Sequence, residues 1–538
     1  MKKLTLLIIL LYWAFTSCTG SDGQGKAHIT VTQRDTTITE ENAYSDLFLD
    51  STTVENYISL NQFTENTADR LRSFYNSRNY QFAWFQPDGL ASQTAAFWNL
   101  HQNYLDYSKD SSLTDKWLHQ QMKPLIAEPG FKVNPHDTTI IKTELELTNH
   151  FFQYAQNAYT GTIDPIELQW FIPRKKVDVV ELLDSLIATK GKDLQNWEPV
   201  NQQYTLLREK LLQYYNIEKA GGWPMIDLGP KKAYKLGDTA AIISQIKQRL
   251  QQVGDMPQGD TANDFNISLL EAVKSVQHRF GLMEDGVIGA GTISRLNIPV
   301  KDRIQQLLIN MERMRWLPKQ PTGDYILVNI PGFTLMVMKD NKVLFSIDAV
   351  VGKAGHNTQV FSDKLQYVVF APYWNVPASI VKNEILPAIS RNPNYLSDNN
   401  MEQTGTANGL PVIRQLPGPD NALGRVKFIF PNSYNIYFHD TPAKSLFSNN
   451  NRAFSHGCIR LEDPFRLAQY LLQDQPQWTD SAIWDAMYGT KEKWVKLTHP
   501  VPVQITYFTA WIGPDGLLNF REDIYGHDAE MAKKLFAQ

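Results

Sequence analysis

The residues with the clearest capacity for chemistry stand in one short run, Ser455-His456-Gly457-Cys458-Ile459-Arg460. Cys458 follows a glycine, which has no side chain to keep the backbone away from a bound carbonyl group. A cysteine thiol has an ordinary pKa of about 8.5, so a nucleophilic cysteine needs a histidine, a cation or a helix N-terminus beside it. A helical pattern over residues 465–472 begins soon after. The run makes Cys458 a candidate nucleophile, although a cysteine near a histidine is often simply buried, so the wider sequence has to decide between the two.

Two histidines could serve as the base for this thiol. His456 lies two residues before Cys458, whereas His439 ends a predicted strand over residues 436–439. Because neighbouring strands lie only about 4.8 Å apart, a histidine at a strand end can reach a thiol in the adjacent loop. We therefore expect His439 to be the base.

The N-terminus and the cysteine count predict export. Two lysines and an apolar run over residues 4–15 precede Thr16-Ser17-Cys18, which is the layout of a secretory signal ending in a bacterial lipobox. We expect a signal peptide over residues 1–17 and a lipid on Cys18. Cys18 and Cys458 are the only cysteines, so an acylated Cys18 leaves Cys458 unpaired in an exported protein. An ordinary secretory signal or an uncleaved anchor would also export the chain.

The remainder of the 538-residue chain divides by composition and periodicity. Residues 18–58 are rich in Thr, Ser, Gly, Asp and Gln and predict a flexible tether. Residues 59–225 have helical spacing of apolar side chains, and residues 235–298 form a compact segment with two further helical stripes. Residues 322–538 hold short runs rich in Val, Ile, Phe and Tyr between turn residues, which predicts a mixed, β-rich domain.

The charge balance excludes one class of partner. The net charge is -4 and the sequence pI is about 6.3, with 43% hydrophobic and 20% charged residues. Such a chain is globular and offers no basic field for nucleic acid.

Longer motifs resemble a known family. The residues His439-Asp440-Thr441-Pro442, followed by the run from Arg452 to Arg460, resemble the active-site signature of L,D-transpeptidases with a YkuD-type catalytic domain. Residues 414–424, 427–432 and 520–526 are similar to its large YcbB-type subgroup, and residues 273–289 resemble a three-helix peptidoglycan-binding module. The resemblance implies a multidomain α+β fold: a helical scaffold, this module, and a β-rich catalytic domain with a cap inserted over residues 378–423.

The resemblance also implies a reaction. Cys458 would attack the carbonyl between the third residue and the terminal D-Ala of a tetrapeptide stem, and the side-chain amine of a second stem would resolve the thioester into a 3-3 cross-link. Peptidoglycan stem peptides would be the substrates, carbapenems would be inhibitors, and no metal or other cofactor would be needed.

The same resemblance suggests supporting residues. Backbone N–H groups around Gly457 and Cys458 would hold the oxyanion, with Ser455 and His456 supporting them. Arg460 would bind a stem carboxylate. Residues on segments flanking the predicted cleft would line it, unless they are simply core: Tyr437, Trp374 and Asn375. Asp440 could orient His439, although many family members use a backbone carbonyl for this role.

Three alternatives remain open at the level of sequence. His439, His456 and Cys458 could be zinc ligands, but no HExxH and no cysteine pair at zinc spacing is present. The same Cys-His pair could pass the acyl group to water, as an L,D-carboxypeptidase or endopeptidase does. The chain could also be a non-catalytic lipoprotein that tethers membrane to wall. In each case we expect a periplasmic lipoprotein, held by the outer rather than the inner membrane, with protein partners unknown.

Overall fold

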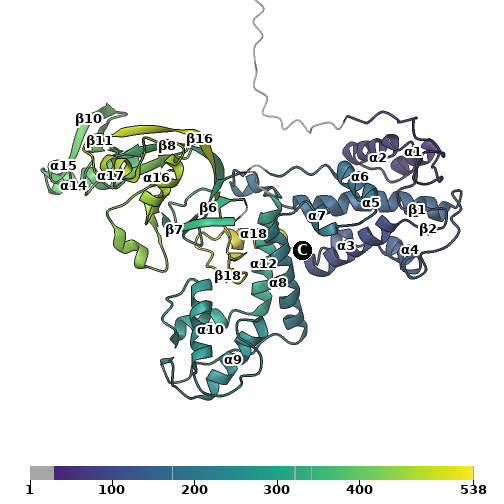
Figure 1. Cartoon of the computed structure of the whole chain (residues 1–538), viewed down its shortest axis with the longest axis horizontal. Coiled ribbons are helices and arrows are strands. Elements are labelled where there is room, and N and C mark those ends of the chain that lie inside the picture. The colour runs from purple at the N-terminus through teal and green to yellow at the C-terminus, as the bar shows by residue number, and fades with distance from the viewer. Residues whose placement is uncertain (1–29, 173, 320–322, 341, 537–538) are drawn as a thin grey trace, which may run out of the picture. The chain divides into compact units, whose positions relative to one another are not determined.

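The computed structural model describes residues 30–172, 174–319, 323–340 and 342–536 (Figure 1). The predicted signal peptide and Cys18 lie outside these ranges. The chain packs as two compact units. One comprises the described residues through Leu90 together with Ala127–Asn149, and the other comprises Ala91–Ile126 and the described residues from His150 onward. The predicted scaffold over residues 59–225 is therefore shared between the two units.

The first unit begins earlier than the predicted tether allows. Helix α1 (Ser51–Leu60) starts after Asp50, whose carboxylate accepts a hydrogen bond from the Thr52 N–H. Upstream of it, Leu47 and Leu49 are buried, and the Leu49 N–H donates to the Tyr80 carbonyl at 2.8 Å. The tether predicted over residues 18–58 is thus wrong at its C-terminal end, because its few apolar side chains are enough to pack. The unit also contains α2 (Glu65–Ser77), β1 (Phe85–Gln86), β2 (Gly89–Leu90) and the first part of α5 (Thr138–Thr160).

The helical part of the second unit is joined by buried polar contacts. The guanidinium of Arg315 donates to the Ala158 carbonyl at 3.0 Å and the Tyr204 hydroxyl at 3.1 Å, and pairs with Glu312 at 2.5 Å. These contacts connect the end of α5 with two long helices, α8 (Gln202–Lys219) and α12 (Val300–Arg315). The other helices of this part are α3 (Ser92–Ser108), η1 (Ser111–Leu113), α4 (Lys116–Ala127), η2 (Pro165–Leu168), α6 (Val179–Ala188) and α7 (Leu194–Trp197).

The compact segment predicted over residues 235–298 has its own core. Its apolar stripes on α9 (Ala241–Val253) and α10 (Ile267–Arg279) meet in one buried cluster, as their spacing predicts. Asn266 caps α10 through the Leu269 N–H, and Gly254 ends α9 in a left-handed conformation. A third helix, α11 (Ala290–Leu296), and the short strands β3 (Ala233–Tyr234) and β4 (Ile288–Gly289) complete it.

The β-rich domain is built on one large sheet. Among the described residues its strand order is β14-β7-β15-β13-β12-β8-β16-β5-β6, and β6 also pairs with β7, so the sheet closes on itself. The buried face of this sheet packs against α16 (Pro464–Leu472) and α17 (Asp480–Met487). The strands are β5 (Tyr325–Asn329), β6 (Thr334–Lys339), β7 (Lys342–Gly352), β8 (Phe361–Phe370), β12 (Val426–Ile429), β13 (Phe438–His439), β14 (Ala453–Ser455), β15 (Ile459–Leu461) and β16 (Lys493–Thr506).

An insertion between β8 and β12 has a separate small core. Val376, Val381, Ile385 and Ile413 form a buried cluster apart from the main one. Its strands pair in the order β10-β11-β9. The insertion therefore packs as a subdomain, with elements from residue 374 to 415: β9 (Trp374–Asn375), α13 (Ala378–Ile380), the π-helix η3 (Val381–Ile385), α14 (Leu386–Arg391), α15 (Tyr395–Asp398), β10 (Met401–Ala407) and β11 (Leu410–Gln415).

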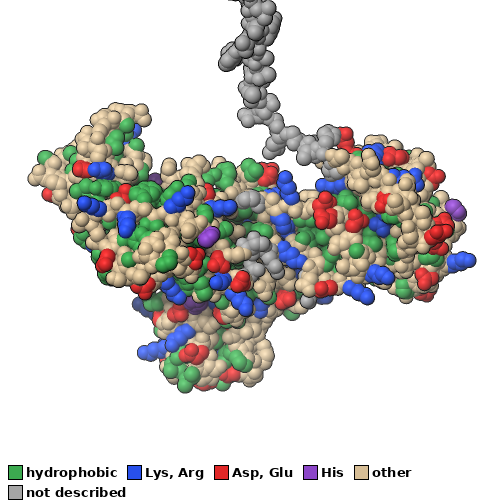
Figure 2. Space-filling model, turned by 45° about the horizontal axis from the view of Figure 1, so that its top comes forward, with side chains coloured by type: hydrophobic (Ala, Val, Ile, Leu, Met, Phe, Trp, Pro, Cys, Tyr) green, Lys and Arg blue, Asp and Glu red, His purple; other side chains and the backbone are tan. Residues whose placement is uncertain are grey.

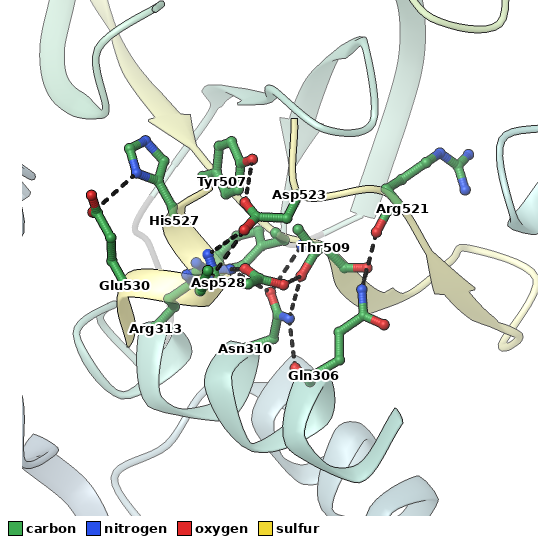
Figure 3. A network of polar contacts seen from close by, with 12 residues as sticks. Gln306, Asn310, Arg313, Tyr507, Thr509, Arg521, Asp523, His527, Asp528 and Glu530 are labelled. Carbon is green, nitrogen blue, oxygen red and sulfur yellow. Dashed lines mark hydrogen bonds and ion pairs between the residues drawn. The ribbon is translucent and has the colours of Figure 1, made fainter. Parts of the chain in front are cut away.

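The C-terminal segment is held by α12 through a polar network (Figure 3). Asn310 exchanges two hydrogen bonds with Thr509, at 2.8 and 2.9 Å, and Arg313 pairs with Asp528 at 2.6 Å in a largely buried contact. The Tyr507 hydroxyl donates to Asp523 at 2.7 Å. The network fixes the segment that contains the late hairpin, β17 (Ala510–Ile512) with β18 (Leu518–Phe520), and the final helix α18 (His527–Leu535).

Charged side chains of both signs share the surface of the molecule. On the face shown in Figure 2, Lys and Arg side chains are interspersed with Asp and Glu. Within the described residues, no helix is long and apolar enough to cross a membrane.

Candidate active site

The predicted nucleophile lies in a tight turn between two strands. Cys458 directly precedes β15, and the turn is closed by Ser455 at the end of β14. The Ser455 hydroxyl donates to the Cys458 carbonyl at 2.5 Å and accepts from the Gly457 N–H at 3.1 Å. Gly457 has a φ of 112°, a backbone conformation that residues other than glycine rarely adopt. Because its N–H already has a partner, Gly457 shapes the turn here and does not match the predicted oxyanion donor; the Cys458 N–H stays the candidate.

Hydrogen bonds from Thr358 and Tyr525 support this turn. The buried Thr358 hydroxyl donates to the Gly457 carbonyl at 2.8 Å and accepts from the Gly352 N–H at 2.9 Å. The Tyr525 hydroxyl accepts from the Thr358 N–H at 3.3 Å and donates to the Gly352 carbonyl. Tyr525 belongs to the C-terminal segment that α12 holds, since its own N–H donates to the Tyr507 hydroxyl at 2.9 Å. The fold thus supports the nucleophile turn through Thr358 and Tyr525, two residues for which no such role was predicted from the sequence.

Replacing Thr358 with valine should show how much this support contributes. The substitution keeps the side chain's shape and leaves the Gly352 N–H and the Gly457 carbonyl without the hydroxyl, at about 1–3 kcal/mol per unsatisfied buried group. A small shift of the thiol is enough to lower the acylation rate by about 10- to 100-fold. The measurements are the rate of acylation and the midpoint of thermal unfolding.

Two further variants separate positioning from stability. Thr358→Ser keeps the hydroxyl and should restore the acylation rate. Thr506→Val removes a comparable buried hydrogen bond, from Thr506 to the Val328 carbonyl at 2.8 Å, and should lower stability without lowering the rate. Equal loss of rate in Thr358→Val and Thr506→Val would show that Thr358 has no special effect on the turn.

Four side chains share one face of the sheet beside this turn. β13 pairs in parallel with β15, with Phe438 opposite Ile459 and His439 opposite Arg460. Since side chains alternate along a strand, Tyr437 and His439 point to the same side as Cys458 and Arg460. The rings of Tyr437 and His439 lie 5.7 Å apart. The predicted base and the predicted nucleophile therefore meet on one surface, with Tyr437 and Arg460 beside them.

His439 is held in one orientation and kept neutral. Its Nδ1–H donates to the Asp440 backbone carbonyl at 2.5 Å, so Nε2 is the nitrogen that can accept a proton. Burial, and next the positive charge of Arg460, lower the pKa of His439 to about 3. The Asp440 carboxylate does not orient the ring, because it accepts from the Arg425 N–H and pairs with Lys444, each at 2.8 Å.

The thiol of Cys458 is also neutral at rest. Its Sγ donates to the Asn435 carbonyl at 3.6 Å. Burial raises the pKa of Cys458 above its ordinary value, and the hydrogen bonds from Tyr437 and the charge of Arg460 only partly oppose this effect. A neutral thiol beside a neutral imidazole means that the proton transfers when the substrate is attacked, rather than before.

This protonation state predicts the pH dependence of alkylation. Only the thiolate reacts with iodoacetamide, so a raised pKa should make the rate at Cys458 rise about 100-fold from pH 7 to pH 9 without a plateau. A Cys18→Ala background leaves Cys458 as the sole thiol, and peptide mass spectrometry measures its alkylation. A rate that levels off below pH 7 would instead indicate a preformed thiolate–imidazolium pair.

An open pocket of about 430 Å³ lies beside the turn. Its lining includes Cys458, Gly457 and His456, but none of Tyr437, His439 and Arg460. The other walls come from three segments of the chain: Gln169 and Phe171, Asn357 and Gln359, and Tyr434, Asn435 and Ile436.

Residues 323–503, which contain this site, match the family model described as "L,D-transpeptidase catalytic domain". The chain carries a YkuD-type L,D-transpeptidase catalytic domain. Residues 69–211 match the model described as "Scaffold domain", and residues 239–296 match "Putative peptidoglycan binding domain". The expected fold class, a multidomain α+β chain with these three parts, is confirmed.

The chain is also similar to individual known proteins. The chain is 34% identical over 243 residues to a Haemophilus influenzae protein named "Putative L,D-transpeptidase", and this match covers 42% of the chain and about half (49%) of that protein's length. Solved structures similar to it include L,D-transpeptidases of Xylanimonas cellulosilytica (16% identity, TM-score 0.18) and Stackebrandtia nassauensis (15% identity, TM-score 0.22). Each match covers 52% of this chain, and 100% and 96% of those chains respectively.

Two residues expected to line the cleft of the catalytic domain lie in its insertion instead. Trp374 packs against the insertion's own core, and Asn375 pairs along the backbone with Arg414 of β11. Neither residue lines the pocket at Cys458. The apolar residues that follow them close a separate subdomain, and a substrate-lining role for Trp374 and Asn375 stays a prediction.

His456 has a different position from His439. It is exposed, its Nε2 lies 3.3 Å from Glu384 of η3, and its ring centroid lies 4.7 Å from that of His356. His356, which sits in a Gly-rich loop, carried no sequence signal for this contact. The helix expected over residues 465–472 spans Pro464–Leu472, and because β15 lies between it and Cys458 its N-terminus does not directly follow the thiol. In the described part of the chain, no three His, Cys, Asp or Glu side chains are grouped to hold a metal.

Proposed function

We propose that the chain is a peptidoglycan L,D-transpeptidase that forms 3-3 cross-links through a thioester on Cys458. The Sγ attacks the carbonyl carbon of the third stem residue while its proton moves to His439 Nε2. The C–N bond breaks, and D-Ala leaves with that proton. The side-chain amine of a second stem then attacks the thioester, gives a proton to His439, and forms the new amide as the thiolate is reprotonated.

One observation carries the proposal: a neutral base with a fixed tautomer and the thiol lie on one face of the sheet. The buried Nε of Arg460 adds support, since it has no hydrogen-bond partner among the described residues. A buried unpaired guanidinium nitrogen is costly, and a carboxylate of the stem would satisfy it. This fits the role expected for Arg460.

We also propose where the protein works. Domains that match peptidoglycan-acting families support a periplasmic or cell-wall location. Within that compartment we place the chain on the outer membrane through a lipid on Cys18, with the segment before residue 30 as a link to the folded part. Radiolabelled palmitate incorporated into the wild type and not into Cys18→Ala would support the anchor.

The test is product analysis with disaccharide-tetrapeptide muropeptides. The wild type should release D-Ala and produce dimers joined between two third residues, identified by mass spectrometry. Release of D-Ala with tripeptide monomers as the sole product would replace the proposal with an L,D-carboxypeptidase. No release of D-Ala would favour the non-catalytic tether.

A further inference from the structure

The pocket beside Cys458 is partly built by a segment outside the catalytic-domain match. Gln169 and Phe171 lie within the scaffold match over residues 69–211, whereas the catalytic match spans residues 323–503. Phe171 is 44% exposed and lines the pocket, although it comes directly after the nearly fully buried Trp170. The scaffold segment therefore presents an aromatic side chain to the space beside Cys458.

The segment that carries these two side chains is firmly anchored. The Trp170 ring packs edge-on against Trp316 with centroids 5.5 Å apart. The Phe171 N–H donates to the Val360 carbonyl at 2.9 Å, and its ring lies 5.2 Å from that of Tyr434. Because Trp170 points into the core, the side chains before and after it point away from the core and line the pocket. The wall is therefore preformed.

The chemistry of the reaction decides which part of the substrate this pocket can hold. The leaving D-Ala nitrogen and the incoming amine both exchange a proton with His439, so both must occupy the side of the thioester that faces His439. The pocket touches Cys458 but includes neither His439 nor Arg460. The pocket therefore suits the acyl group, which is the part of the substrate that stays attached to Cys458 between the two steps.

The lining matches a peptide acyl group. Carboxamide side chains come from Gln169, Asn357, Gln359 and Asn435, and each can both donate to and accept from a peptide unit. Phe171 and Tyr434 supply an apolar wall. No Lys, Arg, Asp or Glu lines the pocket within the described residues. Its volume of about 430 Å³ is within the range of small-ligand sites.

We infer that the scaffold residues Gln169 and Phe171 form the subsite for the acyl part of the donor stem peptide, and so select the donor. The inference rests on the proposed function and adds to it a substrate-binding role for the scaffold. The leaving and accepting groups are bound elsewhere, on the His439 and Arg460 side.

The experiment uses the full-length chain and compares Phe171→Ala and Gln169→Ala with the wild type. The donor is a disaccharide-tetrapeptide muropeptide. D-Ala release gives the kcat/KM of acylation, and mass spectrometry gives the share of thioester passed to amine rather than water. We expect acylation to fall at least 10-fold in Phe171→Ala, while the amine share stays constant. Phe171→Leu, which keeps an apolar wall, should lose less.

Control variants and reagents separate this result from other causes. Ile166→Ala removes a side chain that is 60% exposed on the same segment and does not line the pocket, so its acylation should equal that of the wild type. Alkylation of Cys458 by iodoacetamide should be equal in all variants. Unchanged acylation with a reduced amine share would reassign the pocket to the acceptor and overturn the inference. No change in either the acylation rate or the amine share would also overturn it. A wild type that releases no D-Ala would overturn the proposed function itself.

Discussion

Replacing Cys458 with alanine is expected to abolish cross-linking, with a loss of at least about 10⁴-fold. Removing the nucleophile of an acyl-transfer site leaves only the contribution of binding and of backbone donors. Cys458→Ser should be similarly inactive, because an alcohol is far less acidic than a thiol and the neutral His439 is a weak base. The measurement is the yield of dimeric muropeptides, with D-Ala release followed in parallel.

A carbapenem offers an independent test of the same residue. Attack by the thiolate opens the β-lactam ring, so the whole inhibitor mass should be added to the protein, and the adduct peptide should contain Cys458. Cys18→Ala should keep the adduct and Cys458→Ala should lose it. Full activity or an unchanged adduct in Cys458→Ala would refute the assignment of the nucleophile.

Replacing His439 with alanine is expected to lower the acylation rate by about 10²- to 10⁴-fold, the usual contribution of a general base. With a pKa of about 3, the imidazole is already neutral between pH 5 and pH 8. The pH profile of kcat/KM in the wild type should therefore show no loss of activity from pH 7 down to pH 5 that is due to His439. A rate that falls tenfold over that range would contradict the lowered pKa.

His456→Ala is the matched control for this prediction. His456 is closer to Cys458 in sequence, but it is exposed and contacts Glu384 of the insertion. We expect a loss of less than 10-fold, because its removal leaves the Ser455 hydrogen bonds of the turn intact. If His456→Ala lost as much as His439→Ala, the choice of base would have to be reversed.

Sequence reasoning worked best where local pattern and chemistry coincide. The apolar stripes of α9 and α10 follow from a period of 3.6, and the β-rich character of residues 322–538 follows from short runs of strand-forming residues, which each segment carries within itself. Strand β13 was expected over residues 436–439 and spans only Phe438–His439, because Ile436 and the residues before it line the pocket instead. Such ends depend on neighbours that a local pattern does not contain.

The amino-acid sequence by itself determined the candidate nucleophile, the candidate base and the order of the three parts, because single residue types and short periods carry that information. Only the tertiary structure decided that Trp374 belongs to the insertion, that Thr358 and Tyr525 support the turn, and that Phe171 forms a wall of the pocket. These residues are 67 to 287 positions from Cys458 along the chain, and the sequence indicates none of these roles for them. Their roles arise from contacts made when distant segments pack together, and such contacts have no signature in the local spacing of residues.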